Sequence, residues 1–130
     1  MIYAVNYILE NSATIQAMVR FRSNDTDYKV YPVVVPQSES DPYIVTRIAG
    51  KSRPAKNCDF NYTIEVLSYA TSYDGVTDLN DAVISVLEAQ AAGTINGVTY
   101  GYLVFTNELD GFDDGRDLYF KISTFEGSAS

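Results

Sequence analysis

The residues best suited to chemistry in this 130-residue chain are carboxylates gathered near its C-terminal end. They are Asp110, Asp113, Asp114 and Asp117. A hard cation such as calcium needs several oxygen ligands on one loop, but calcium loops place acidic residues at alternate positions, and this cluster does not follow that spacing. We therefore favour a solvated turn between the last two strands, built around Gly111 and Gly115, that binds no metal.

Paired carboxylates also catalyse glycoside hydrolysis, which needs a sugar-stacking cleft beside them. The chain has 11 tyrosines that could line such a cleft. Tyrosines at alternate strand positions are more often packing or interface residues, because the ring is apolar and the hydroxyl is polar. A small acidic domain that binds carbohydrate or metal stays open as the third and least favoured function class.

The groups that most enzymes use as nucleophile and base are scarce. The chain has no histidine, which removes the commonest general base, the commonest metal ligand and any Ser–His or Cys–His nucleophile. Cys58 is the only cysteine, and we interpret it as a partly buried residue at the start of a strand. Residues 93–97 are not followed by the Lys–Ser/Thr pair that comes after the second Gly of a phosphate-binding loop. We expect no catalytic residue, no cofactor, no metal and no enzymatic activity.

Length and charge bound the remaining function classes. A chain of 130 residues is long enough for one core, so we expect a single domain over residues 1–130. Its net charge of −8 disfavours tight binding to nucleic acid, which depends on neutralising phosphates. Residues 1–56 carry 7 Lys/Arg and 5 Asp/Glu, whereas residues 57–130 carry 2 and 12. This split suits head-to-tail contact between copies, or it reflects two solvated faces of one domain.

The stretch from residue 57 to residue 90 predicts a strand and a helix that bury their apolar faces on each other. Residues 60–66 alternate, which places Phe60, Tyr62, Ile64 and Val66 on one side. The helix has apolar residues at three- and four-residue spacing: Val76, Leu79, Val83, Val86 and Leu87. We expect Ser72 or Asp74 to cap its start and Gly93 to end it.

The other patterns predict two short helices and four more strands. The helical stretches cover residues 2–10 and 13–19, as two helices or as one kinked helix, and Ser12 is expected to cap the second stretch. The strands cover residues 28–35, 43–49, 99–106 and 117–125. Pro32 has no N–H and indicates a sheet edge or a break, and Asn96-Gly97 indicates a tight turn.

The last strand and the segment before it complete the expected fold. We expect an acidic turn over residues 109–114, with Leu118, Phe120 and Ile122 facing inward and Lys121 and Ser123 outward. Short connections favour antiparallel pairing. The predicted fold class is α+β, a mainly antiparallel sheet of about five strands with helices packed on one face.

Four stretches, in this order, carry a resemblance to a known family. They are residues 17–19 (Ala-Met-Val) after a short helix; residues 30–32 (Val-Tyr-Pro) with Pro36-Gln37, leading into residues 42–45 (Pro-Tyr-Ile-Val); residues 62–66 (Tyr-Thr-Ile-Glu-Val) with a helix from Asp78 to Leu87; and residues 111–114 (Gly-Phe-Asp-Asp) before residues 118–122 (Leu-Tyr-Phe-Lys-Ile). Together they resemble the tail completion, or tail terminator, family of long-tailed bacteriophages.

The resemblance implies a structural role without catalytic residues. Members of this family are small α+β protomers that form a ring, commonly hexameric, at the head-proximal end of the tail tube. The ring stops polymerisation of the tail tube protein and meets the head-completion or connector proteins, while DNA passes through without specific binding. The implied location is the virion tail or neck, after assembly in the host cytoplasm. Another neck or tail component, a head-side connector or a tail tube subunit, is the alternative.

Two segments are the expected interfaces of such a ring. A loop bounded by Pro36 and Pro42 is expected to contact a neighbouring subunit or the next tail component. Its residues are Gln37, Ser38, Glu39, Ser40 and Asp41. The basic connection that follows holds Lys51, Arg53 and Lys56, which we expect to face the carboxylate cluster of the next copy.

Overall fold

The computed structural model describes residues 1–19, 30–32, 42–90, 92–95 and 97–129 of the chain. Three helices and seven strands follow one another in the order α1 (Ile2–Glu10), α2 (Ala13–Met18), β1 (Val30–Pro32), β2 (Tyr43–Ser52), β3 (Phe60–Ala70), α3 (Tyr73–Ala89), β4 (Gly93–Ile95), β5 (Val98–Tyr100), β6 (Val104–Asp113) and β7 (Leu118–Ala129). None of the helices in this described part is long and apolar enough to cross a membrane.

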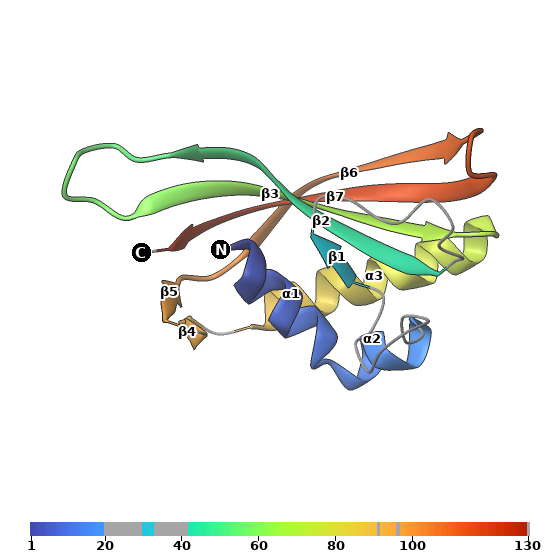
Figure 1. Ribbon diagram of the computed structural model, residues 1–130, viewed down its shortest axis with the longest axis horizontal. Helices are drawn as coiled ribbons and strands as arrows, with labels where there is room; N and C mark the ends of the chain where they lie inside the picture. The colour runs from blue at the N-terminus through green and yellow to red at the C-terminus, as the bar shows by residue number, and fades with distance from the viewer. Residues whose placement is uncertain (20–29, 33–41, 91, 96, 130) are drawn as a thin grey trace.

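The strands form one curled sheet with the helices on one of its faces (Figure 1). The strand order is β1-β2-β3-β7-β5-β4, and β6 pairs with β7 beside β5. Every pairing is antiparallel except that of β1 with β2. The predicted α+β class is confirmed; the sheet has two more strands than expected because β4 and β5 form a separate short hairpin.

Local sequence signals explain where the helices begin. The Ser12 hydroxyl accepts a hydrogen bond from the Ile15 N–H at the start of α2, and the Ser72 hydroxyl accepts one from the Gly75 N–H, 3.0 Å away, at the start of α3. Both caps were predicted. The prediction for the end of α3 was wrong: α3 ends at Ala89 with an extended Gln90, and Gly93 lies in β4.

The main core lies between the helices and the sheet. Leu79, Val83 and Leu87 of α3 are at most 1 % exposed and share a cluster with Ile64 and Val66 of β3. α1 adds Val5 and Leu9, and α2 adds Ile15, which are fully buried in the same cluster. The predicted helix stripe and the predicted inward face of β3 are therefore confirmed.

The expected orientation of the last strand was wrong. Ile64 pairs with Phe125, so the β7 residues on the helix side are Phe125, Ser123 and Lys121. Leu118 and Ile122 belong instead to a second, smaller cluster on the opposite face of the sheet, with Tyr43 and Leu67. Phe120 stacks on the same side against Tyr69, at 5.7 Å between ring centroids. Alternation along β7 could not identify the inward face because both faces bury apolar residues.

The strand expected over residues 99–106 is divided, and the acidic turn expected over residues 109–114 is a strand. β5 ends at Tyr100, and β6 begins at Val104 and runs to Asp113 along β7. The turn falls at residues 114–117, where Asp117 has a φ of 57°. The polar residues of β6 gave no sequence signal for a strand. Pairing with β7 satisfies the backbone N–H and C=O groups of β6 regardless of its side chains.

Two turn and edge predictions are confirmed. Gly97 has a φ of 80° in the tight connection from β4 to β5, as the Asn-Gly signal predicts. β1 lies at the end of the strand order, which fits Pro32 because an edge strand tolerates a missing N–H.

Candidate subunit interface

A long hairpin of β2 and β3 projects beyond the helices at one end of the molecule (Figure 1). A β-bulge between Ile48 and Gly50 interrupts the regular pairing of β2 with β3. Every residue from 51 to 59 is exposed, including Cys58, so the expected burial of Cys58 was wrong. Exposed residues contribute little to the core, so residues 51–59 are available for contacts with other molecules.

The basic residues of this hairpin are held by neighbouring side chains. The Lys51 Nζ lies 4.1 Å from the centroid of the Phe60 ring, and the Arg53 guanidinium carbon lies 4.9 Å from the same centroid. Arg53 also donates a hydrogen bond to the backbone carbonyl of Lys56 at 3.1 Å. Each exposed cation–ring contact is worth about 0.5–1 kcal/mol, enough to restrict the side chains without neutralising them. We name Lys51, Arg53 and Lys56 the basic tip.

The turn between β6 and β7 carries the acidic residues. The Asp113 carboxylate accepts hydrogen bonds from the N–H groups of Gly115 and Arg116, at 3.0 and 3.2 Å, so its role is to shape the turn. Asp114 and Asp117 are exposed. We name Asp113, Asp114 and Asp117 the acidic tip. Within the described residues, no group of three or more His, Cys, Asp or Glu side chains could hold a metal ion.

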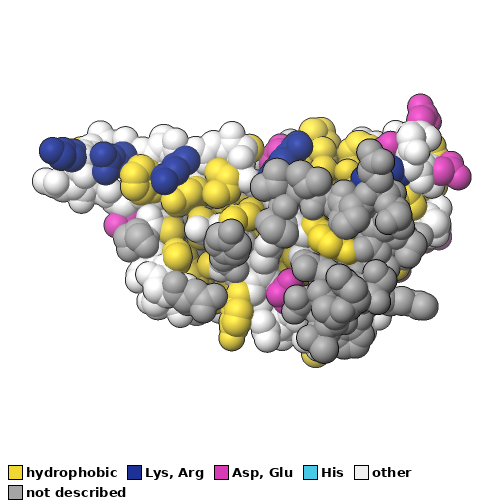
Figure 2. All heavy atoms as spheres, viewed as in Figure 1, with side chains coloured by type: hydrophobic (Ala, Val, Ile, Leu, Met, Phe, Trp, Pro, Cys, Tyr) yellow, Lys and Arg dark blue, Asp and Glu magenta, His cyan; other side chains and the backbone are white. Residues whose placement is uncertain are grey.

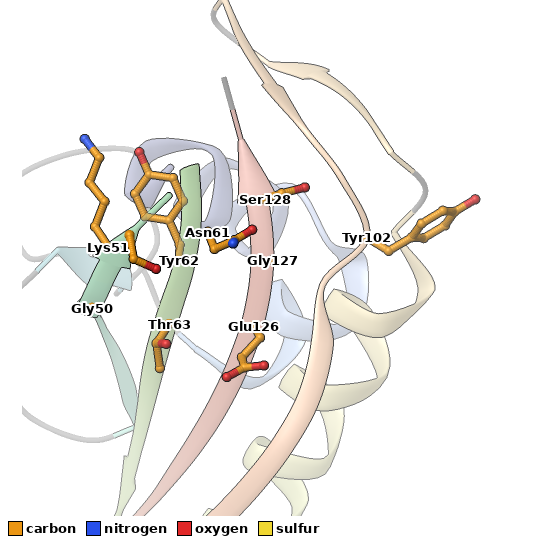
Figure 3. Close-up of a pocket in the computed structure, with 10 residues that line it drawn as sticks. Gly50, Lys51, Asn61, Tyr62, Thr63, Tyr102, Glu126, Gly127 and Ser128 are labelled. Carbon is orange, nitrogen blue, oxygen red and sulfur yellow. The ribbon is translucent and has the colours of Figure 1, made fainter. Parts of the chain in front are cut away.

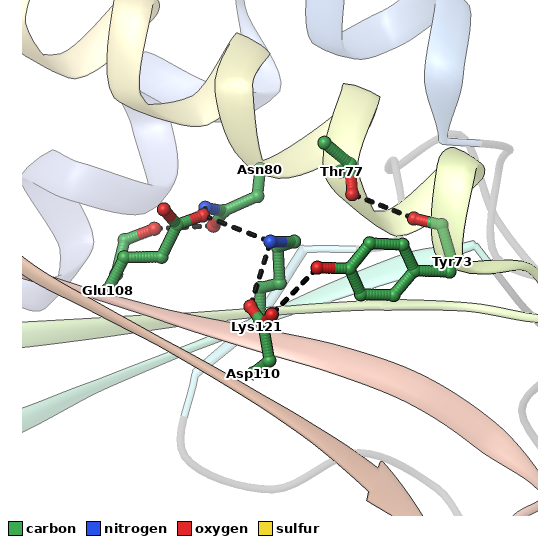
Figure 4. Close-up of polar contacts among 7 residues, drawn as sticks. Tyr73, Thr77, Asn80, Glu108, Asp110 and Lys121 are labelled. Atoms are coloured by element: carbon green, nitrogen blue, oxygen red, sulfur yellow. Dashed lines mark hydrogen bonds and ion pairs between the residues drawn. The ribbon is translucent and has the colours of Figure 1, made fainter.

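Asp110 is separated from the acidic tip and belongs to a polar network under α3 (Figure 4). Its carboxylate accepts a hydrogen bond from the Lys121 ammonium at 2.8 Å and one from the Tyr73 hydroxyl at 2.7 Å. The hydrogen bond from Lys121 is the main cause that lowers the pKa of Asp110, and the same bond raises the pKa of Lys121. Asp110 is therefore already paired within its own chain.

The two tips lie at opposite ends of the longest axis of the molecule. Figure 2 shows Lys and Arg side chains at the end formed by the β2–β3 hairpin and Asp and Glu side chains at the far end. The structure thus gathers the three predicted basic residues, and three of the four predicted acidic ones, but holds the two groups apart. The two tips of one copy cannot meet each other, whereas those of two copies can.

The predicted interface loop, Gln37, Ser38, Glu39, Ser40 and Asp41, lies outside the described residues. The sequence did not predict a second exposed feature, the apolar side chains that lie along β6 and just before it. They are Tyr102, Val104, Leu109 and Phe112, which are 67, 53, 55 and 44 % exposed. A bulge between Phe105 and Asn107 breaks the alternation that would have identified this strand.

A cleft of about 720 Å³ lies beside the base of the projecting hairpin (Figure 3). Its wall includes Asn61 and Thr63 of β3, Glu126 and Ser128 of β7, and Tyr102. These groups are hydrogen-bonding side chains, with Glu126 as the single carboxylate among them. Among the described residues that line the cleft there is no second carboxylate of the kind that glycoside hydrolysis uses.

The fold is similar to that of a chain in a solved structure described as "Virion of native gene transfer agent (GTA) particle". The two chains superpose with a TM-score of 0.71 and 14 % sequence identity, over 96 % of this chain and 90 % of that chain. Neither a protein-family model nor a curated protein matches the sequence. At this level of identity the likeness shows a shared fold, which extends over nearly the full length of both chains.

Proposed function

We propose that this chain is a structural component of a phage-like virion, and that it forms the ring that completes the head-proximal end of the tail. The observation that carries the proposal is the fold likeness to a gene transfer agent virion chain, which leaves only a small part of either chain unmatched. The resemblance of four sequence stretches to the tail terminator family supports the same assignment independently of the coordinates.

The distribution of charge supports assembly into a ring. A closed ring needs heterologous contacts, in which a patch on one side of each copy meets a different patch on the next. The basic and acidic tips are two such patches at opposite ends of one protomer. Exposed ion pairs are worth only about 0–1 kcal/mol each, so they would set the register while apolar surface supplies most of the affinity.

In this role the ring stops polymerisation of the tail tube protein on one side and presents a surface to head-completion or connector proteins on the other. The loop from Gln37 to Asp41 is proposed as a further contact with a neighbouring subunit or tail component. DNA passes through the ring without being gripped, which fits a net charge of −8. No catalytic step is part of this function.

Another neck or tail component, a head-side connector or a tail tube subunit, is the second candidate. The same fold likeness supports it, because the description of the matched structure names the particle and not a position within it. The two candidates differ in how assembly ends. A terminator forms discrete rings, whereas a tube subunit stacks into fibres.

The test is native mass measurement of the purified full-length chain over a wide concentration range, with electron microscopy of the assembled species. Discrete closed rings without fibres are the expected result. Fibres would favour a tube subunit. A strict monomer, or tight salt-sensitive binding to duplex DNA, would contradict the proposal.

A further inference from the structure

Among the described residues, the sheet has two edges whose backbone is unpaired on one side. β1 covers only Ile44 to Thr46 of β2, so within the described residues the part of β2 from 47 to 52 pairs with β3 alone. At the other side, β7 is the one strand of the described part of the chain that pairs with β6. One N–H there, that of Phe105, donates to the Glu88 carboxylate at 3.0 Å. The rest of each edge presents N–H and C=O groups that can accept another strand.

The two edge strands carry charges of opposite sign, and neither strand contains a charge of the other sign. β2 contains Arg47 and Lys51 and no acidic residue, whereas β6 contains Glu108, Asp110 and Asp113 and no basic residue. Arg47 is paired with Glu65 of β3, and Glu108 and Asp110 are paired with Lys121 of β7. With these partners included, the β2 edge keeps a net charge of +1 and the β6 edge one of −2. Charged side chains on an edge strand normally prevent association of identical edges. Here two β2 edges repel each other, as do two β6 edges, but a β2 edge and a β6 edge attract.

Strand directions allow the same pairing. β2, β3, β7 and β6 are successive neighbours, and each is antiparallel to the next. An even number of alternating strands gives the two outer strands opposite directions. When copies repeat head to tail with their helices on the same side, β6 of one copy is therefore antiparallel to β2 of the next, and antiparallel pairs are the slightly more stable kind.

We propose that β6 of one copy pairs with residues 47–52 of β2 in the next copy, so that one antiparallel sheet runs from subunit to subunit. This inference depends on the proposed ring but gives its copies a contact other than the one between the tips. Antiparallel pairing places the basic tip of one copy beside the start of β6 in the next, away from the acidic tip. Ile48 and Leu109, which are 39 and 55 % exposed, gain cross-strand neighbours in this arrangement. Residues 47–52 of β2 lie toward the basic tip, whereas β6 extends to the acidic tip (Figure 1). Because these two segments lie at different heights along the sheet, neighbouring copies that pair through them are offset along the strands. Closed barrels have such an offset because their strands tilt.

Hydrogen–deuterium exchange of the full-length chain, compared between dilute monomer and assembled ring, tests the pairing directly. Amides of residues 47–52 and 104–111 should exchange roughly tenfold more slowly, or slower still, in the ring, because ladder hydrogen bonds protect them. The short β4–β5 hairpin is an internal reference whose exchange should not change.

Disulfide trapping gives a second measurement that tolerates an unknown register. In a Cys58→Ser background, Ala49→Cys is combined in turn with Thr106→Cys, Asn107→Cys and Leu109→Cys. At least one combination should yield covalent oligomers on oxidation. The matched control pairs Ala49→Cys with Asp81→Cys, an exposed position on α3, and should yield none.

The outcomes separate this inference from the function it depends on. Rings whose β2 and β6 amides stay unprotected, with no trapping at any β6 position, overturn the strand pairing and leave the ring intact. Trapping by the α3 control as readily as by β6 also overturns it. A chain that remains monomeric throughout the concentration series overturns the strand pairing and the ring together.

Discussion

Lys121 and Asp110 form an ion pair across β7 and β6, with 2.8 Å between the ammonium nitrogen and a carboxylate oxygen. Lys121 is only 6 % exposed and faces the helices. The sequence predicted that Lys121 would face outward and that apolar residues of the last strand would face inward. Asp110, Glu108 at 3.4 Å and the ring of Tyr73, whose centroid is 5.0 Å away, surround its charge. Asn80 completes the network by donating to Glu108 and accepting from Ser123 (Figure 4). A buried cation is tolerated here because two elements, β6 and α3, supply its partners.

This ion pair predicts a loss of stability in acid. The pKa of Asp110 is lowered from 3.8 in the folded chain, chiefly by the hydrogen bond from Lys121. A depressed pKa contributes stability that is present above the unfolded value and lost as the pH falls through the folded one. Thermal unfolding between pH 7 and pH 2 should show this loss below about pH 4, and Asp110→Asn should reduce it. Asp114→Asn is the control, and equal reduction by both variants would contradict the assignment.

Truncation of the α3 stripe should destabilise the main core. Leu87 is fully buried against β3, and removing a buried leucine side chain typically costs about 2–5 kcal/mol. Leu87→Ala should lower the free energy of unfolding by that amount in denaturant titration. Ser85→Ala, at an exposed position of the same helix, should change it little. Equal stability of Leu87→Ala and the unmodified chain would show that the packing of α3 is wrong.

Neutralising the basic tip should weaken self-association. Arg53→Gln with Lys56→Gln lowers the net charge by two, and Thr14→Glu with Ser85→Glu, at exposed helix positions, lowers it by the same amount. Only the first pair removes charge from the proposed contact, so only it should raise the concentration needed for ring formation in sedimentation measurements. A charge reversal, Arg53→Glu with Lys56→Glu, should act more strongly, and Asp114→Lys should partly restore its assembly. If Arg53→Gln with Lys56→Gln and Thr14→Glu with Ser85→Glu weakened assembly equally, a role for the basic tip would be contradicted.

High salt should weaken the ring without dissolving it. At about 1 M salt the Debye length is roughly 3 Å, so exposed ion pairs between the tips are largely screened. Ile48 and Leu109 lie on opposite faces of the sheet, and the proposed strand pairing covers apolar surface at each. This burial does not depend on screening and should keep part of the assembly intact. Light scattering across a salt series measures this, and complete dissociation at moderate salt would show that charge alone holds the copies together.

The acidic tip should not bind calcium. Asp113 already accepts two backbone hydrogen bonds, and Asp110 is paired with Lys121, which leaves Asp114 and Asp117 of the predicted cluster to bind an ion. Calcium takes six to eight oxygen ligands, more than this turn offers. Calorimetric titration should detect no saturable site. A micromolar site that Asp114→Asn abolishes would contradict the prediction.

Much of the fold could be predicted from local patterns in the sequence. The caps at Ser12 and Ser72 were recognisable because a hydroxyl at a helix start accepts an N–H that would otherwise be unpaired. The inward faces of α3 and β3 followed from periodicity, since one face of each is clearly more apolar. The same local reasoning located the basic tip between two strands.

What the tertiary structure alone decided depends on pairing between distant segments. The register of β7 against β3 turned Lys121 and Ser123 toward the helices, although their side chains are polar. Pairing with β7 also makes residues 104–113 a strand, although the segment contains three acidic residues. The same pairing places Asp110 within hydrogen-bond distance of Lys121. The opposite placement of the two tips has the same origin: each hairpin extends as far as its own ladder, and the direction of each ladder is set by strands far away in the sequence.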